Sequence, residues 1–259
     1  MEQSSRYIVL FAAAVCGVCS IFVATAAVSL KDRQELNAKL DVQKKVLQLV
    51  GLMESGESLS AEEIQQRYAD NIEARVVDLS TGNYVEDIDA STYDQRAAAA
   101  DPDQSREAPP NLAKVRRVPE NALVYQVKDD GKVRSLILPI QGKGLWSTLY
   151  GYLALEADSR TVEGITFYEH AETPGLGGEV DNPRWKSLWK GRKAFDDQWQ
   201  VALQVKKGSA GTPEDDPYQV DGLSGATITS RGVTGAIEFW LGREGYGSYL
   251  EKYRSERGI

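Results

Sequence analysis

The sequence has few of the residues that bind metals or form disulfides. Its 259 residues include two cysteines, Cys16 and Cys19, and one histidine, His170. Both cysteines lie in an N-terminal apolar segment, so the rest of the chain offers no disulfide and no cysteine ligands for zinc or an iron–sulfur cluster. Thiols in apolar surroundings are poor nucleophiles, which favours simple packing over a redox or metal role shared with a partner chain.

The sequence also lacks an excess of basic residues. The formal net charge is -8. Nucleic-acid binding requires a basic face, so we expect no nucleic-acid partner. The length allows one sizeable domain with extensions, or two small domains. His170 could act as a general base, but a solvated or structural role is the simpler interpretation.

The longest uncharged run covers residues 7–30. At about 1.5 Å per residue, a helix of this length can cross a hydrocarbon core of about 30 Å. A cleaved signal peptide is the alternative, because Ala24-Thr25-Ala26 has the form of a cleavage site. The run is longer than a usual signal core and continues into a helical pattern. We therefore expect a retained membrane anchor.

The charges around this segment give a conflicting signal about its orientation. Only Arg6 precedes it, whereas five basic residues follow it closely: Lys31, Arg33, Lys39, Lys44 and Lys45. The positive-inside rule would keep the following side cytoplasmic, although long domains can cross a membrane despite such charges.

After the anchor, helical and strand patterns are mixed without βαβ alternation, which predicts an α+β fold. We divide the chain into an anchor (1–30), a helical and hairpin extension with a flexible insertion (31–113), and a main domain (114–259). The extension is predicted to contain a helix over 30–53, a capped helix from Ser60 to about Ala69, a hairpin over 73–87 and an exposed insertion over 89–113.

The main domain is predicted to begin with a hairpin whose turn is Asp129-Asp130-Gly131-Lys132. The predicted strands cover residues 122–128, 133–140, 145–156, 161–169 and 198–206. The predicted helices cover residues 182–190, 227–242 and 247–256.

The most informative motif is Asp221-Gly222-Leu223-Ser224-Gly225-Ala226-Thr227. Its small residues form a turn that places the Thr227 hydroxyl at the start of a predicted helix. The glycines permit unusual backbone angles and close approach by a ligand, and Ser224 is placed to cap the helix. Unpaired N–H groups and the helix dipole make such a start suitable for phosphate, although the same pattern also fits an ordinary capped helix.

This motif resembles the flavinylation sequence of the FMN-binding domain family. In that family, a dedicated flavin transferase joins the FMN phosphate to the last threonine of Ser-Gly-Ala-Thr. The resemblance implies Thr227 as the attachment point, with Thr229 as the nearby alternative. It implies that the other cofactor-binding residues of the motif are Asp221, Ser224, Gly225 and Ala226.

Two further segments resemble the same family. Gly144-Leu145-Trp146-Ser147 is similar to a loop that packs beside the flavin, and residues 172–177 are similar to its Glu-Thr-Pro-Gly-Leu-Gly motif. Side chains here would bury the flavin rings and reach its polar edge. No Rossmann site is expected, because Val180 occupies the last glycine position. The implied contacts are Leu145, Trp146, Ser147, Glu172, Thr173, Pro174, Gly175, Leu176 and Gly177.

The whole arrangement resembles the C subunits of sodium-translocating NADH:quinone oxidoreductases. The resemblance implies an electron-relay subunit that is incomplete alone and works with other subunits of a membrane complex. It also implies a bacterial inner-membrane location with the flavin domain facing the periplasm. Three alternatives stay open: the flavin subunit of a ferredoxin:NAD oxidoreductase complex, a stand-alone membrane-anchored flavin carrier or sensor, and a secreted binding domain without flavin.

Overall fold

The computed structural model describes residues 5–54 and 56–259. The chain divides into two compact units, residues 1–43 and 44–259. Residues 1–4 of the predicted anchor lie outside the described range. The predicted boundaries between anchor and extension, at residue 30, and between extension and main domain, at residue 113, stay predictions.

The N-terminal unit is helical. Helix α1 (Ser5–Leu49) is continuous, so the predicted extension of the apolar run into a longer helix is confirmed. Its apolar side chains are exposed, with Phe22 at 72% and Val28 at 76%. A helix that exposes this much apolar surface is stable in a hydrocarbon core rather than in water. Its length and composition are sufficient to cross a membrane.

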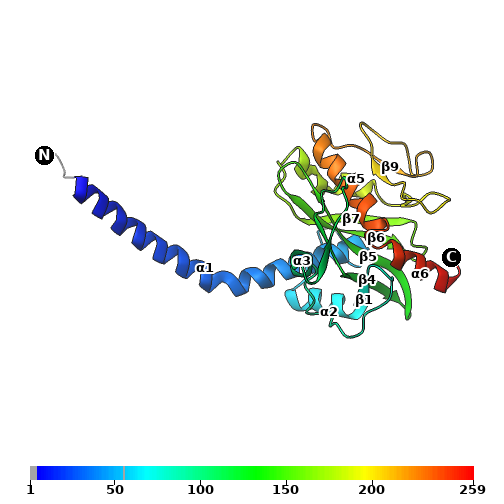
Figure 1. The fold of residues 1–259 in the computed structure, drawn as a ribbon, viewed down its shortest axis with the longest axis horizontal. Helices are drawn as coiled ribbons and strands as arrows, with labels where there is room; N and C mark the ends of the chain where they lie inside the picture. The colour runs from blue at the N-terminus through cyan, green and yellow to red at the C-terminus, as the bar shows by residue number, and fades with distance from the viewer. Residues whose placement is uncertain (1–4, 55) are drawn as a thin grey trace. The chain divides into compact units, whose positions relative to one another are not determined.

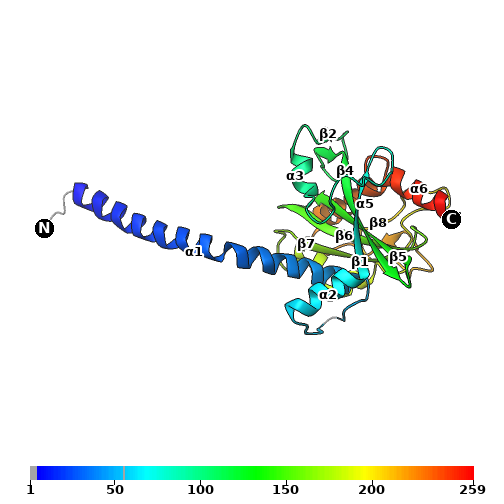
Figure 2. The ribbon, with the colours of Figure 1, turned by 90° about the horizontal axis from the view of Figure 1, so that it is seen from below.

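The folded unit is built on a five-stranded antiparallel sheet, shown in Figures 1 and 2. The strand order is β1-β4-β5-β6-β7. The predicted α+β class and four of the five predicted main-domain strands are confirmed. Asp130 and Gly131 have φ angles of 46° and 74°, as a two-residue hairpin turn requires. The strands are β1 (Ile72–Asp78), β4 (Asn121–Asp129), β5 (Lys132–Lys143), β6 (Thr148–Glu156) and β7 (Val162–Glu169).

One face of the sheet is covered by helix α5 (Thr227–Leu241), which packs against β5. The approach is close because glycines lie at the crossing. A methyl group on Gly142 would lie 2.5 Å from the Gly232 carbonyl oxygen, and one on Gly235 would lie 2.6 Å from the Ala113 nitrogen. The buried Val233, Ala236 and Ile237 fill the remaining space. This packing fixes where α5 begins relative to the end of β5.

The opposite face is covered by the end of α1 and by helix α2 (Ala61–Asn71). Val46 and Leu47 are fully buried, and Leu49 lies against Gly164 of β7. The predicted capping box of α2 is confirmed: the Ser60 hydroxyl accepts from the Glu63 N–H, and the Glu63 carboxylate accepts from the Ser60 N–H. The sheet is therefore covered on both faces, although half-buried tyrosines on the second face, such as Tyr125 and Tyr150, line a cavity.

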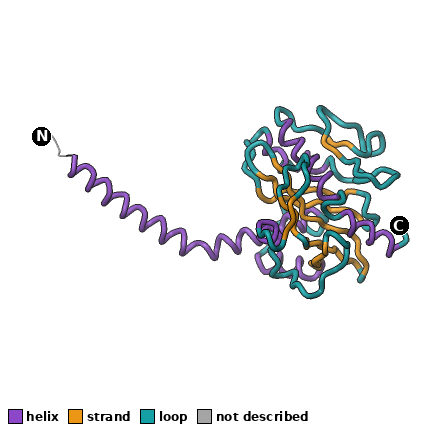
Figure 3. The backbone as a smooth tube through the Cα atoms, viewed as in Figure 1, coloured by secondary structure: helices purple, strands orange, loops and turns teal. Residues whose placement is uncertain are grey.

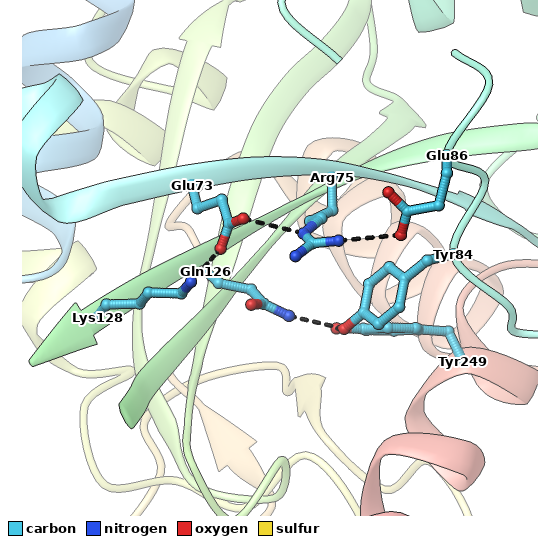
Figure 4. A network of polar contacts seen from close by, with 7 residues as sticks. All are labelled: Glu73, Arg75, Tyr84, Glu86, Gln126, Lys128 and Tyr249. Atoms are coloured by element: carbon cyan, nitrogen blue, oxygen red, sulfur yellow. Dashed lines mark hydrogen bonds and ion pairs between the residues drawn. The ribbon is translucent and has the colours of Figure 1, made fainter. Parts of the chain in front are cut away.

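The predicted hairpin over residues 73–87 is only partly correct. After the turn, the chain returns along β1 through a single bridge between Val77 and Tyr84, and β1 pairs instead with β4. Side chains hold the returning segment, as Figure 4 shows: Gln126 donates to the Tyr84 hydroxyl at 2.7 Å, and Tyr84 and Tyr249 join their hydroxyls at 3.1 Å. These side-chain bonds add to the two backbone hydrogen bonds between the segment and β1, from Asp78 N–H to the Asn83 carbonyl and from Val85 N–H to the Val76 carbonyl, both at 2.9 Å.

Residues 89–113 are not an irregular linker. They contain helix α3 (Gln95–Ala100), capped by Asp94, and strand β2 (Ser105–Glu107), which pairs with β3 (Arg117–Pro119). The alanine run forms the helix, and Ala98 is buried. The prediction that the segment is exposed is confirmed for most of its residues, whereas the expectation of irregular structure was wrong. A run of alanines gives no apolar period, but alanine has the best helix propensity.

Between β7 and α5 most of the chain is loop, on the side of the unit where β9 lies in Figures 1 and 3. The predicted helix over 182–190 is shorter: it is α4 (Pro183–Ser187), after the 3-10 turn η1 (Gly177–Asp181). The predicted strand over 198–206 is wrong except for β8 (Gln204–Val205), which pairs in parallel with β9 (Gln219–Val220). The final predicted helix is confirmed as α6 (Gly247–Arg257).

The α5–β5 crossing generates a stability prediction. In Gly232→Ala, the added methyl group would overlap the Lys143 carbonyl oxygen. Alanine normally favours a helix over glycine, so destabilisation would isolate the packing effect. We expect a loss of about 1–3 kcal/mol in the free energy of unfolding, measured by urea denaturation. Arg231→Ala, at the neighbouring exposed position, is the control and should not be destabilised.

Candidate functional site

Three segments meet at one end of the sheet. The first is the turn 144–147 between β5 and β6, the second is the loop that follows β7, and the third is the start of α5. The strand register brings the first two together, because Lys143 pairs with Thr148 and Tyr150 pairs with Glu169. The candidate FMN-binding residues that are far apart in sequence therefore converge in the fold.

The Glu172 carboxylate joins all three segments. Its Oε1 accepts hydrogen bonds from the N–H groups of Trp146 and Ser147, at 2.9 and 3.1 Å. Its Oε2 accepts from the Leu145 N–H at 3.1 Å and from the Thr229 hydroxyl at 2.6 Å. Only 6% of the Glu172 surface is exposed. One buried carboxylate thus connects the 144–147 turn to the first turn of α5.

Two glycines leave the space that the Glu172 carboxylate occupies. A methyl group on Gly144 would lie 2.6 Å from the Glu172 Oε1 atom, and one on Gly177 would lie 2.6 Å from its Oε2 atom. The Gly177 methyl group would also lie 2.6 Å from the Thr229 hydroxyl oxygen. Atoms do not approach this closely, so both positions exclude larger residues while Glu172 keeps its bonds.

The hydrogen bonds keep Glu172 ionised. Burial alone would raise the pKa of its carboxyl, but the bonds from the Thr229 hydroxyl and from three backbone N–H groups outweigh burial. The pKa is therefore held below its ordinary value of 4.5.

His170 supports the same loop. Its Nε2 atom lies 2.9 Å from an Asp181 carboxylate oxygen, and its Nδ1 atom accepts the Glu172 N–H at 3.3 Å. Both ring nitrogens are occupied by contacts that position Glu172. The structural interpretation of this histidine is confirmed.

The start of α5 presents free backbone donors. Ala226 is the N-cap and has no side-chain cap, so the predicted capping by Ser224 is wrong. Gly225 has a φ of 70°, and this turn leaves Ser224 exposed instead of directed at the helix. Within the described residues, five N–H groups make no hydrogen bond, those of Ser224, Gly225, Thr227, Ile228 and Thr229. Such donors, with the helix dipole, suit an anion.

The two candidate threonines differ in accessibility. Thr227 is exposed, and its hydroxyl makes no hydrogen bond within the described residues. Thr229 is 1% exposed, and its hydroxyl donates to Glu172. Of the two hydroxyls, that of Thr227 is therefore the one accessible to solvent.

Large exposed apolar side chains gather around this helix start. Trp146 is 67% exposed, and Leu145, Leu176 and Ile228 are each close to half exposed. They come from the three segments that Glu172 joins, and Leu176 lies against Gly225. Apolar surface of this extent beside polar donors is typical of a ligand site. Ile228 was not among the predicted site residues, although its position between two threonines on the first helical turn is a usable signal.

The remaining loop residues add polar groups to this surface. Thr173, Pro174, Gly175 and Leu176 are exposed, and the Thr173 carbonyl accepts from the N–H groups of Leu176 and Gly178. In the described chain, the N–H groups of Gly175 and Gly177 make no hydrogen bond. The Ser147 hydroxyl accepts a hydrogen bond from the Ala171 N–H at 2.7 Å and so joins the 144–147 turn to the loop after β7.

Asp221 and Gly222, at the start of the motif, contact residues outside it. The Asp221 carboxylate accepts from the Ala210 N–H at 2.8 Å, and its carbonyl accepts from the Trp185 ring at 2.8 Å. Gly222 has no positive φ, but a side chain there would collide with the Lys206 carbonyl. These two residues position the turn through protein contacts.

The Glu172 geometry generates a prediction about pH. Glu172→Gln should lower the free energy of unfolding at neutral pH by about 2–3 kcal/mol, because an amide cannot accept the same set of donors. The folded-state pKa lies below 4.5, so the carboxylate contributes stability above the unfolded pKa and loses it as pH falls through the folded pKa. The difference between wild type and variant should therefore shrink below about pH 4.5.

Urea denaturation at a series of pH values measures this difference. Glu156→Gln is a suitable control, because Glu156 is exposed and its side chain makes no hydrogen bond within the described residues. It should change the free energy of unfolding by less than about 0.5 kcal/mol. A Glu172→Gln variant as stable as the control at neutral pH would contradict the linking role of the carboxylate.

Comparisons with known proteins agree with this site. Residues 144–242 match the model of the FMN-binding domain, so the match begins at the 144–147 turn and ends just after α5. The C subunit of the Na(+)-translocating NADH-quinone reductase from Vibrio alginolyticus is 47% identical, over 92% of this chain and 90% of its own. The corresponding protein of Pseudomonas aeruginosa is 46% identical, over 98% of this chain and 97% of its own.

Solved structures show the same fold. The crystal structure of NqrC from Shewanella oneidensis superimposes with a TM-score of 0.76 at 37% identity, covering 84% of this chain and 98% of that one. The structure of the C subunit from Parabacteroides distasonis has a TM-score of 0.65 at 29% identity, covering 85% of this chain and 96% of that one. The sequence identity over nearly the full length, the shared fold and the matched FMN-binding domain together show that this chain belongs to the family of Na(+)-translocating NADH-quinone reductase C subunits.

Proposed function

We propose that this chain is a flavin electron-relay subunit of a membrane-bound, sodium-translocating NADH:quinone reductase and carries FMN as a phosphoester on Thr227. The family relationship supports the role as a subunit of such a reductase. The matched FMN-binding domain supports FMN as the cofactor. The chain would not complete the reaction alone, because other subunits must supply NADH oxidation and quinone reduction.

The observation that carries the proposal is the start of α5. An exposed, unengaged Thr227 hydroxyl lies on a helical turn whose first three N–H groups are free, next to the free N–H groups of Ser224 and Gly225. A phosphate esterified to this hydroxyl would keep one negative charge. The free donors and the positive end of the helix would stabilise that charge, by about 0.3–1 kcal/mol from the dipole at an exposed site.

The neighbouring side chains fit the ring system of FMN. Leu145, Trp146, Leu176 and Ile228 provide apolar surface, and the free N–H groups of Gly175 and Gly177 provide donors for polar ring or ribityl atoms. When bound, FMN would supply the redox chemistry, and these residues would set its exposure and orientation. A covalent tether would retain it in every redox state.

Formation of the phosphoester requires a maturation enzyme. We propose a flavin transferase as a transient partner that acts on the exposed Thr227 side chain. Burial of Thr229 supports this choice of residue. The Glu172 bond to Thr229 also protects that hydroxyl, so the two threonines would have separate roles, one modified and one structural.

The apolar part of α1 supports a retained, single-pass anchor in a bacterial inner membrane. We propose that residues 44–259 face the periplasm, despite the five basic residues after the apolar run, because long domains cross a membrane with little regard for nearby charges.

The attachment site can be tested by in-gel flavin fluorescence of the denatured protein, coexpressed with a flavin transferase. Thr227→Ala should remove the fluorescent band and the corresponding mass increase. The variant should stay folded, because loss of one exposed hydroxyl that has no hydrogen bond in the fold costs less than about 0.5 kcal/mol.

Thr229→Ser is the matched control, because it keeps a hydroxyl within reach of Glu172 and should retain covalent flavin. A fluorescent Thr227→Ala protein would move the attachment to another residue. A wild-type protein without fluorescence would remove the covalent proposal altogether.

The orientation can be tested with a membrane-impermeant maleimide. Ser255→Cys places an exposed thiol on α6, in a background in which Cys16 and Cys19 are alanine. A periplasmic domain predicts labelling once the outer membrane alone is permeabilised. Labelling only after the inner membrane is disrupted would place the domain in the cytoplasm.

A further inference from the structure

A patch of exposed side chains beside the candidate FMN site has the properties of a protein interface. We propose that Leu112, Lys114, Arg116 and Lys143, together termed the Lys114 patch, bind an acidic surface of the partner protein that exchanges electrons with this chain. The patch borders a groove of about 1420 Å³. The inference rests on the proposed function, because it requires electrons to pass through this chain.

The loop that carries the patch is held in one conformation by its own side chain Asn111. The Asn111 amide donates to the carbonyls of Pro109 and Val115, both at 2.8 Å, and accepts from the Val115 N–H at 3.0 Å. The Ala108 N–H donates to the Arg116 carbonyl at 2.9 Å. A preorganised loop loses little conformational entropy on binding.

The same loop is fixed to the frame of the candidate site. The Lys143 N–H donates to the Ala113 carbonyl at 2.8 Å. Gly235 of α5 approaches Ala113 so closely that a methyl group would collide with it. The patch, the end of β5 and α5 therefore form one body, and Lys143 is followed directly by the 144–147 turn. A partner on the patch would lie beside the proposed flavin.

The outward side chains of this loop have no partners in the described part of the chain. Leu112 is 63% exposed, and Lys114 and Arg116 are exposed without an ion pair. Within the described residues the Lys143 ammonium group donates only to the Trp146 carbonyl, at 3.3 Å. Lys114 also has a φ of 56°, a region that glycine or asparagine occupies more readily. A lysine in this conformation presents a long cationic side chain where a smaller residue would fit with less strain.

The charges of the groove favour an acidic partner. Glu107 and Glu238 also line it, and so does Arg96, which is ion-paired with Glu169. Arg117 adds a further cation, which donates to the Ser105 hydroxyl and to the carbonyls of Pro102 and Ser105. Within the described residues four of the lining cations have no ion pair, and they outnumber the two carboxylates: Lys114, Arg116, Arg117 and Lys143. The whole chain has a net charge of -8. An acidic protein would be repelled elsewhere and steered toward this patch.

An anionic bilayer is a less suitable occupant. A lipid surface would meet the net negative charge of the chain over a broad area, whereas a protein surface can match a small positive region. An exposed apolar side chain flanked by cations also follows the usual anatomy of a protein interface, with an apolar centre and a polar rim.

The test uses the full-length chain in the purified complex with all of its other subunits, and the double charge reversal Lys114→Glu/Arg116→Glu. NADH-driven quinone reduction should fall by about fivefold or more at low ionic strength, because the patch would repel its acidic partner. The fluorescent flavin band should remain equal to wild type, because neither residue contributes to the candidate FMN site. Salt should also release the variant chain from the complex more readily.

The matched control is Lys132→Glu/Lys190→Glu, which makes the same charge change. Both lysines are exposed and lack ion pairs in the described chain. Lys132 begins β5, and Lys190 precedes Gly191, whose N–H bonds to Val162 at the start of β7. Both therefore lie at the opposite end of the sheet from the patch. The control should keep wild-type activity.

Equal activity in the two double variants would overturn the docking proposal. A loss seen only in vesicles containing phosphatidylglycerol, and absent in pure phosphatidylcholine, would overturn it in favour of lipid binding. A wild-type complex without a covalent flavin band would overturn the proposed function, and the docking proposal with it. Loss confined to the patch variant, in both lipids and with the flavin band intact, would support docking.

Discussion

The structure around the candidate site depends on one buried carboxylate. Glu172 accepts three backbone N–H groups from the 144–147 turn and one hydroxyl from α5. A buried anion without partners costs several kcal/mol, so the donors and the carboxylate require each other. The glycines at 144 and 177 leave room for the carboxylate, and His170 bonds to its backbone. Several motif residues thus have structural roles that follow from Glu172.

This arrangement gives the two threonines at the start of α5 different surroundings. Thr229 is buried and joined to Glu172, while Thr227 is exposed beside free N–H groups. Leu145, Trp146, Leu176 and Ile228 are exposed on segments that the same carboxylate fixes in place. A rigid frame with an apolar surface and free donors is suited to hold a flavin in one orientation. The rigidity comes from the sheet, through the close packing of α5 on β5.

The charge distribution adds a second level of organisation. A chain with a net charge of -8 has a local group of unpaired cations on the loop attached to the end of β5. The loop is rigid because Asn111 bonds to both of its sides, and it adjoins the 144–147 turn. A redox partner must approach its cofactor closely, so a docking surface and a cofactor site on one rigid body would preserve their separation during electron transfer.

Much of the fold could be predicted from local patterns. The α2 capping box, the Asp130-Gly131 turn and the apolar run of α1 each follow from short-range physics, and each is confirmed. Predictions failed where tertiary contacts replaced local rules. The alanine run of α3 has no clear apolar period. The segment returning from β1 makes only a short backbone pairing with β1 and is also held by side-chain bonds to Gln126 and Tyr249.

For the site, the sequence by itself determined the residue types: a small-residue turn before a threonine, a tryptophan-containing turn and a glycine-rich loop. Only the tertiary structure decided their arrangement. Ser224 is not the cap that its position suggested: Ala226 is the N-cap, and Gly225, at a φ of 70°, lies between Ala226 and the exposed Ser224. The linking role of Glu172 is invisible in the sequence, because its donors lie 25 to 57 residues away. Long-range hydrogen bonds of this kind exist only once the sheet has brought the strand ends together.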